Sequence, residues 1–137
     1  MSFVLDASVT MSWAFEDEAD AYSDIVLDKL RKSHAITPDI WALEIANTLL
    51  VGERTGRLNE SKIAYFLGLI AALKVNVIPV GLDLATGTIL ILAREHKLSS
   101  YDAAYLELAM REGVPLATCD DRLKAAAKRA GLALVSA

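Results

Sequence analysis

The stretch Phe3-Val4-Leu5-Asp6-Ala7-Ser8 decides the fold that this sequence predicts. Its three leading apolar residues indicate a short strand buried on both faces, and that strand runs directly into Asp6. In open α/β sheets, ligands bind in the crevice outside the carboxyl ends of the strands, so an acid at this point is a candidate for chemistry. The alternative is that Asp6 only caps the helix that follows, because Asp is a preferred N-cap residue.

Length and composition predict one cytoplasmic domain that spans residues 1–137. A chain of this size buries about two-thirds of the surface that it exposes when unfolded. The hydrophobic fraction of 54% is high, so we expect a large core or an apolar surface for a partner. No apolar run reaches the roughly 18 residues of a membrane span, and no basic region precedes the first strand as in a secretory signal. We therefore expect no membrane segment.

Charge and cysteine content exclude several classes of site. The formal charge of −4 argues against nucleic-acid binding through the net field, although it allows local basic patches. Cys119 is the only cysteine, which excludes an internal disulfide and a cysteine-based zinc site. Neither His34 nor His96 is near it in sequence, so we expect a small buried hydrophobic residue and not a catalytic thiol.

Strand and helix signals alternate along the rest of the chain. Apolar residues at helical spacing predict helices over residues 8–15, 20–32, 40–55, 59–73, 84–96, 101–112 and 122–130. Further strands are expected at residues 35–37, 75–80, 114–118 and, at the sheet edge, 132–135. This order predicts an α/β fold with a mostly parallel sheet that is covered by helices on both faces.

Four acids occupy unusual positions in this pattern. Asp6 and Asp120 follow strands, Glu44 lies on the apolar stripe of a helix, and Asp102 lies in the first turn of another. Each has an ordinary explanation: a helix cap, a glutamate whose head reaches water at the edge of the stripe, or compensation of the helix dipole. Either Asp120 or its neighbour Asp121 is expected to cap the last helix.

The four acids have a joint explanation if the sheet is parallel. Strand ends and helix starts then converge at one edge of the sheet. Carboxylates a few ångströms apart repel one another, and without a cation some are pushed toward protonation. A set of oxygen ligands suits Mg²⁺ or Mn²⁺, and such an ion can hold phosphate oxygens and generate a hydroxide nucleophile. The sequence therefore predicts metal-dependent hydrolysis of a phosphodiester.

Four motifs, in order and spanning the chain, resemble a PIN-domain nuclease of the VapC toxin type. They are Val-Leu-Asp-Ala-Ser at 4–8, Leu-Glu-Ile-Ala-Asn-Thr-Leu at 43–49, Tyr-Asp-Ala-Ala-Tyr-Leu-Glu-Leu-Ala at 101–109, and Leu-Ala-Thr-Cys-Asp at 116–120. The resemblance implies a three-layer α/β/α sandwich and an endoribonuclease that depends on Mg²⁺ or Mn²⁺. It also implies a homodimer that is held inactive by a small antitoxin encoded beside it.

The resemblance assigns roles to individual residues. By motif match, the catalytic and metal-binding acids would be Asp6, Glu44, Asp102 and Asp120. Ser8 and Thr118 would support the site through hydroxyl hydrogen bonds, and Asn47 would orient a ligand or a backbone group. The family pattern selects Asp120 as the fourth acid and leaves Asp121 as the helix cap.

Two surface features have more than one interpretation. Basic side chains just past the Glu44 helix could hold an RNA backbone or form a solvated charged surface; they are Arg54, Arg57 and Lys62. Aromatic side chains could line a groove for a partner helix, as in similar toxins, or belong to the core; they are Trp13, Phe15, Tyr22, Tyr65 and Phe66.

Rival functions fit the residues less well. A phosphate-receiving regulator or phosphoryl-transfer enzyme usually needs an acid close to Asp6 or a lysine after a later strand, and neither is present. A non-catalytic phosphate-binding or protein-binding module would not need four acids. A PIN nuclease of RNA processing outside a toxin–antitoxin system fits the same residues, and an adjacent small reading frame encoding a DNA-binding antitoxin would distinguish the two.

Overall fold

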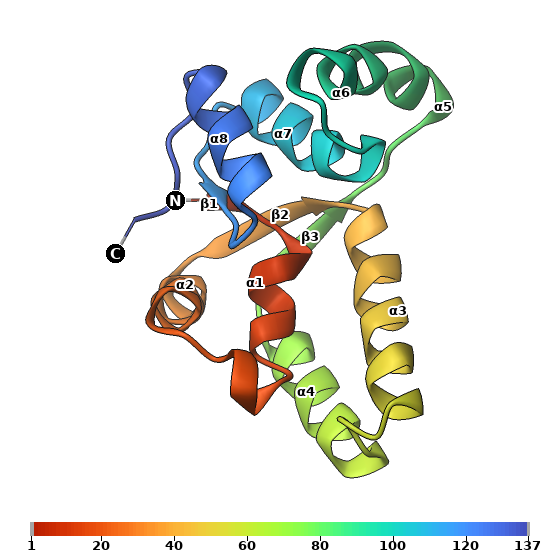
Figure 1. The fold of residues 1–137 in the computed structure, drawn as a ribbon. Coiled ribbons are helices and arrows are strands. Elements are labelled where there is room, and N and C mark those ends of the chain that lie inside the picture. The colour runs from red at the N-terminus through yellow and green to blue at the C-terminus, as the bar shows by residue number, and fades with distance from the viewer. Residues whose placement is uncertain (1, 137) are drawn as a thin grey trace.

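The computed structural model describes residues 2–136 and is built around one four-stranded parallel sheet (Figure 1). The strand order is β3-β2-β1-β4. The strands are β1 (Ser2–Leu5), β2 (His34–Pro38), β3 (Val75–Ile78) and β4 (Leu116–Ala117). Val4 lies opposite Ile36 of β2 on one side and Leu116 of β4 on the other. The apolar strand that starts the sequence is therefore in the interior of the sheet, as predicted.

Helices cover both faces of this sheet. Figure 1 shows α1 to α4 on one side and α6, α7 and α8 on the other. The α-helices are α1 (Ala7–Ser12), α2 (Ala21–Lys32), α3 (Ile40–Arg54), α4 (Glu60–Ala72), α5 (Leu82–Leu84), α6 (Leu90–His96), α7 (Ser100–Glu112) and α8 (Asp121–Arg129). A 3₁₀ turn, η1 (Glu16–Glu18), precedes α2, and a π-helical turn, η2 (Ala85–Ile89), joins α5 to α6. The predicted α/β/α arrangement with a parallel sheet is confirmed. Within residues 2–136, no helix combines the length and apolarity that crossing a membrane requires.

The core lies on both faces of the sheet, and one part of it lies between the sheet and α7. Seven consecutive residues of α7, 103 to 109, are buried, and the helix packs against β1, β2 and β4. Tyr105 and Leu106 are completely buried beside Val4 and Leu5 of the first strand. Because α7 is enclosed in this way, the acid in its first turn is held at a fixed place relative to the strand ends.

Two predicted elements differ from the structure. Residues 132–135 form no strand; they make only an isolated parallel bridge between Leu116 and Leu134. Two backbone hydrogen bonds join this segment to the short β4. Leu116 N donates to Ala133 O at 3.0 Å, and Val135 N donates to Leu116 O at 2.9 Å. The predicted helix 84–96 begins earlier, at Leu82, and contains the π turn, where Gly87 and its flanking threonines are weak helix formers.

The cap of the last helix also corrects a prediction. Asp120 has extended backbone angles and its Oδ1 accepts a hydrogen bond from Leu123 N at 2.9 Å, so Asp120 is the N-cap of α8. Asp121 is the first helical residue, and its side chain is 99% exposed. Assigning the cap to Asp121 is therefore wrong.

Two glycines inside helices give opposite predictions for substitution by alanine. A Cβ at Gly52 of α3 would lie 2.8 Å from Leu58 Cδ1 and 3.2 Å from Phe15 Cζ, both buried, whereas a Cβ at Gly68 of α4 meets nothing within 4 Å. Gly68→Ala should raise the free energy of unfolding by about 0.5–1 kcal/mol, because alanine favours the helix. Gly52→Ala should raise the free energy of unfolding by less than Gly68→Ala does, because the added Cβ would clash with Leu58. Urea unfolding of both variants measures the difference, and equal gains would contradict the close packing at Gly52.

Candidate active site

The register of the sheet places Asp6 beside Thr118. Leu5 pairs with Ala117, so the next residues of the two strands are neighbours, and Asp6 N donates to Ala117 O at 3.0 Å. Thr118 Oγ1 donates to Asp6 Oδ2 at 2.7 Å, and Ser8 Oγ donates to the same oxygen at 2.6 Å. Asp6 is 4% exposed and, although it is the N-cap residue of α1, its side chain makes no capping bond. Capping therefore does not account for this carboxylate.

The same two hydroxyls also bind the turn between β4 and α8. Ser8 Oγ accepts from Cys119 N, and Thr118 Oγ1 accepts from Asp120 N, each at 3.0 Å. Ser8 and Thr118 therefore link Asp6 to the loop that carries Asp120. The motif match predicts that these two hydroxyls support the active site, and that role stays a prediction.

Glu44 is held from a helix on the other side of the sheet. Tyr105, fully buried on α7, donates its hydroxyl to Glu44 Oε1 at 2.7 Å. Tyr105 is not among the residues predicted from the sequence to have a role in the site. The available signal was its spacing, because a residue three positions after Asp102 lies on the same side of a helix. Tyr105 thus joins the element that carries Asp102 to the one that carries Glu44.

All four predicted acids line one cavity of about 570 Å³. Ser8 lines it as well, and the remaining lining residues include Glu18, Asp20, Thr48 and Cys119. Asn47 is exposed and lies outside the lining. Asn47 follows Glu44 by three residues and Thr48 follows it by four. In a helix of 3.6 residues per turn, a spacing of four brings a side chain closer to the direction of the Glu44 side chain than a spacing of three does, so Thr48 faces the cavity.

Cys119 differs from its expected environment. It is half-buried and lines the same cavity, where its Sγ lies 3.6 Å from Ser23 Oγ. The hydrogen bond from its backbone to Ser8 draws it toward the cavity. Cys119 is therefore less buried than predicted, although it still packs against the core as a partly buried hydrophobic residue.

Burial and mutual repulsion shift the acids toward protonation. Burial raises the pKa of Asp6, against the hydrogen bonds from Ser8 and Thr118, and the charge of Asp120 adds to the rise. Desolvation also raises the pKa of Glu44, opposed by Tyr105 and assisted by the charges of Asp6 and Asp102. The pKa of Asp102 is raised by burial and then by Asp6 and Asp120. A cavity of like charges of this kind favours a cation.

The donor set fits a hard divalent ion. The lining offers carboxylate and hydroxyl oxygens, which suit Mg²⁺ or Mn²⁺. Among residues 2–136, however, no three acidic, histidine or cysteine side chains converge closely enough to form a ready-made ion site.

A second cavity, of about 680 Å³, forms an aromatic groove between the loop after α1 and helix α4. Four of the five aromatic residues that suggested a groove line it: Trp13, Phe15, Tyr65 and Phe66. Tyr22 does not. Phe15 and Phe66 are also part of the core, whereas Tyr65 is 81% exposed. The groove thus has a buried aromatic floor and an exposed aromatic rim.

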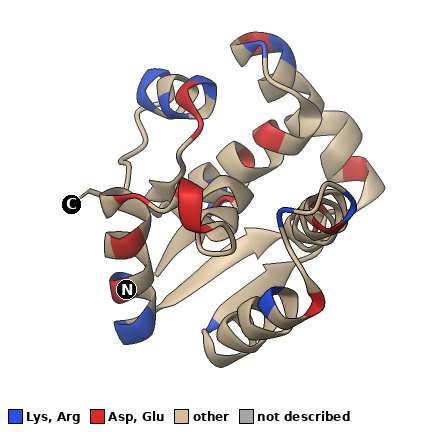
Figure 2. Cartoon of the chain, turned by 60° about the horizontal axis from the view of Figure 1, so that its bottom comes forward, with Lys and Arg blue, Asp and Glu red and all other residues tan. Residues whose placement is uncertain are grey.

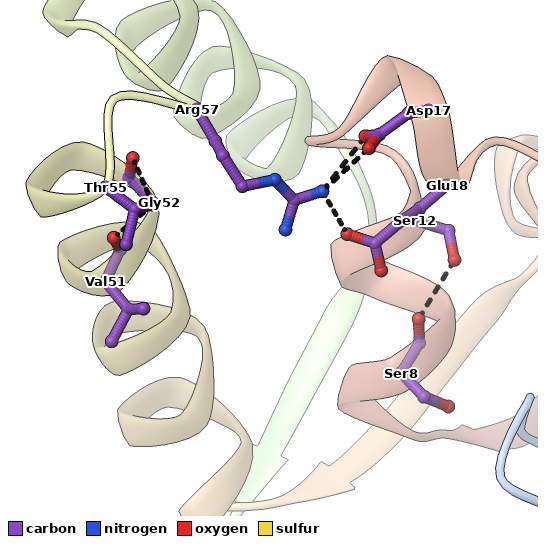
Figure 3. Close-up of polar contacts among 8 residues, drawn as sticks. All are labelled: Ser8, Ser12, Asp17, Glu18, Val51, Gly52, Thr55 and Arg57. Carbon is purple, nitrogen blue, oxygen red and sulfur yellow. Dashed lines mark hydrogen bonds and ion pairs between the residues drawn. The ribbon is translucent and has the colours of Figure 1, made fainter.

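Arg57 is one of the residues that line the aromatic groove. Figure 3 shows its side chain reaching from the loop after α3 to η1. One terminal nitrogen lies 3.0 Å from Asp17 Oδ1 and 2.9 Å from Glu18 Oε2, and the guanidinium lies 4.1 Å from the centroid of the Phe15 ring. Because two acids neutralise Arg57, the structure favours the charged-surface interpretation of this residue over phosphate binding.

Comparisons with known proteins show which family this chain belongs to. The PIN domain family model matches residues 3–129. Ribonuclease VapC3 from Pyrobaculum aerophilum is 31% identical over 127 residues, which cover 90% of this chain and 92% of that protein. The crystal structure of PAE2754 from the same organism aligns with a TM-score of 0.69 at 25% identity, covering 92% of this chain and 84% of the other. VapBC2 from Rickettsia felis, solved with a DNA fragment from its promoter, aligns at 0.66 and 17% identity over 98% of both chains, which shows likeness of fold.

Proposed function

We propose that this chain, which belongs to the PIN-domain family, is a metal-dependent endoribonuclease of the VapC toxin type that hydrolyses RNA phosphodiester bonds. The observation that carries the proposal is the convergence of Asp6, Glu44, Asp102 and Asp120 on one cavity. They come from two strand ends and two helices, far apart in the sequence. The similarity to a curated ribonuclease supports the reaction class.

The four acids would hold Mg²⁺ or Mn²⁺, with Asp6, Glu44 and Asp102 as central ligands and Asp120 as the fourth. A bound divalent ion supplies an activated water and neutralises charge on the phosphate. Ser8 and Thr118 fix the Asp6 carboxylate by both donating to its Oδ2. Tyr105 likewise holds one oxygen of Glu44. The carboxylates are therefore positioned by neutral donors that add no charge to the cavity.

The proposal is tested by cleavage of a structured RNA pool with Mg²⁺ or Mn²⁺ against EDTA. Wild-type protein should cut only with metal, and Asp102→Asn should not cut. Asp121→Asn is the matched control, because it removes an exposed acid outside the cavity. Cleavage that persists in EDTA, or that is equal in Asp102→Asn and wild type, would rule out the proposed site.

Removing the Tyr105 hydroxyl should weaken metal binding more than folding. In Tyr105→Phe, Glu44 loses the hydrogen bond that opposes the rise of its pKa, and its carboxylate is no longer oriented. Loss of such an outer partner typically lowers metal affinity by about 10–100-fold. Calorimetric titration with Mn²⁺ measures the change. Tyr101→Phe, on the exposed side of the same helix, is the control, and equal affinities in the two variants would exclude this role for Tyr105.

The aromatic groove is the proposed docking site for a small antitoxin. Its exposed Tyr65 and half-buried Trp13 offer an apolar surface to a partner helix. We also propose a homodimer in the cytoplasm. Exposed apolar side chains that a dimer could bury lie on α3, α5 and α6; they are Leu43, Leu82 and Ile91, with 68%, 77% and 52% of their surface exposed.

A further inference from the structure

A cleft of basic side chains lies between the end of α6 and helix α8. It has a volume of about 430 Å³, and we call it the cationic cleft; it is lined by His96, Lys97, Arg122, Ala125 and Arg129. Figure 2 shows Lys and Arg positions along α8 and at the end of α6. Arg129 Nε donates to His96 Nδ1 at 3.4 Å, which joins the two walls. Four of the five lining residues thus carry basic side chains.

Three of these basic side chains form no ion pair within the part of the chain that the structure describes. Arg57 and Arg111 each pair with acids, at 2.9 Å and 2.8 Å. Over residues 2–136, no ion pair involves Lys97, Arg122 or Arg129. In a chain with a net charge of −4, a basic cluster without acidic partners indicates an anionic ligand.

The backbone at Lys97 is a second, independent observation. Lys97 ends α6 with φ 54° and ψ 44°, in the left-handed region. The other positive-φ residues among 2–136 are all glycines: Gly56, Gly113 and Gly131. Glycine is the usual residue at such a helix end, and a residue held in a disfavoured backbone conformation often marks a functional site. Lysine at this position is costly for the fold, which points to a role for its side chain.

Helix α8 links the cationic cleft to the carboxylate cavity, because its N-cap Asp120 lines the cavity and its own residues line the cleft. Arg122 follows Asp120 by two residues at the start of α8, and Lys97 precedes the Ser99 cap of the helix that carries Asp102. The positive charge of Arg122 acts against the rise in the pKa of Asp102. A strand bound with its scissile phosphate at the acids therefore meets positive charge on the α8 side.

We propose that Lys97, Arg122 and Arg129 bind phosphate groups of the RNA that flank the scissile bond. This inference rests on the proposed nuclease function and replaces Arg57 as the backbone contact. Phosphates are the ligand because the cleft offers several cationic donors, and arginine forks match phosphate oxygens. The net negative charge of the chain opposes binding elsewhere, so the cleft would set the path of the strand.

The test is binding of a short fluorescein-labelled single-stranded RNA, followed by anisotropy in EDTA so that no cleavage occurs. The triple variant Lys97→Gln, Arg122→Gln, Arg129→Gln should bind at least about tenfold more weakly, and the slope of log Kd against log salt should fall by about 2. The control triple Arg94→Gln, Lys128→Gln, Lys74→Gln removes the same charge from exposed positions outside the cleft and should stay near wild type. Equal weakening in the two triples, an unchanged slope, or no binding by wild type would overturn the proposal.

A second variant separates binding from folding. Lys97→Gly should raise Tm by about 3 °C, because glycine relieves the left-handed strain, while RNA affinity falls. A structural role for Lys97 would give the opposite change in Tm, and retained affinity would remove Lys97 from the cleft. Binding is measured in EDTA and is therefore independent of cleavage. If wild type binds RNA through the cleft but shows no metal-dependent cleavage, the proposed nuclease function is wrong and the proposed RNA binding by the cleft is retained.

Discussion

Asp6→Asn should abolish metal-dependent RNA cleavage while leaving the chain folded. The substitution keeps the size of the side chain and an oxygen that can accept from Ser8 and Thr118. It removes a buried negative charge at the centre of the four acids, and we expect the cleavage rate to fall by about 10³-fold or more. Tm of the metal-free protein should be equal to or above that of wild type, because the charge that repels Asp120 is gone.

The control for Asp6→Asn is the exposed acid Asp121. Asp121→Asn changes the net charge by the same amount, at a side chain that is 99% exposed and outside the cavity. Its cleavage rate should stay within about twofold of wild type, as expected for a surface substitution. Equal rates in the two variants would show that the activity comes from elsewhere, and unfolding of Asp6→Asn would assign Asp6 a structural role.

Metal-free protein should lose stability as pH rises through the acidic range. Burial raises the pKa values of Asp6, Glu44 and Asp102 above their ordinary values of 3.8, 4.5 and 3.8. The folded state then binds more protons than the unfolded state, so these groups stabilise the fold fully at low pH. That contribution declines from the ordinary pKa values upward and is lost once pH passes the raised values. The free energy of unfolding, measured in EDTA by urea at a series of pH values, should therefore fall across this window.

Adding a divalent metal should restore much of the stability that the metal-free protein loses as pH rises. An ion that binds only the folded state stabilises it and favours the charged carboxylates, so adding Mn²⁺ at neutral pH should raise Tm. The same addition at a pH below the ordinary values should have little effect. Asp6→Asn should show a flatter pH profile in EDTA and a smaller response to Mn²⁺. A profile that is identical in wild type and Asp6→Asn would mean that Asp6 is not among the groups that titrate on folding.

Much of the fold follows from local signals. The apolar run before Asp6 and the alternation of strands and helices predicted a parallel sheet with two helical layers. Asp20, Asn59 and Ser99 accept hydrogen bonds from the first turns that they precede, as expected of cap residues. The predictions that failed concern segments with weak local signals, whose structure depends on contacts with other elements. Residues 132–135 have the composition of a strand, but β4 spans only Leu116–Ala117 and gives them a single bridge.

The parts of the site that could be predicted are the residues whose position depends only on the direction of the strands. Parallel pairing of β1 with β4 brings Asp6 to Thr118, and the following loop brings Asp120 to the same cavity. Contacts that depend on the packing of one helix against another were not predictable. Tyr105 of α7 reaches Glu44 of α3 although the two helices lie in different layers, and one sequence does not reveal this contact. Arg57 is neutralised by η1, a turn whose position depends on the tertiary fold.

The central claim is that four distant acids form one divalent metal site, and calorimetric titration of Mn²⁺ tests it most directly. The variants are Asp6→Asn, Glu44→Gln, Asp102→Asn and Asp120→Asn, with Asp121→Asn as the control. Each of the four should raise Kd by about tenfold or more, as expected for loss of a ligand, while the control stays at the wild-type value. Wild-type affinity in the four cavity variants, or equal weakening in the control, would contradict the claim.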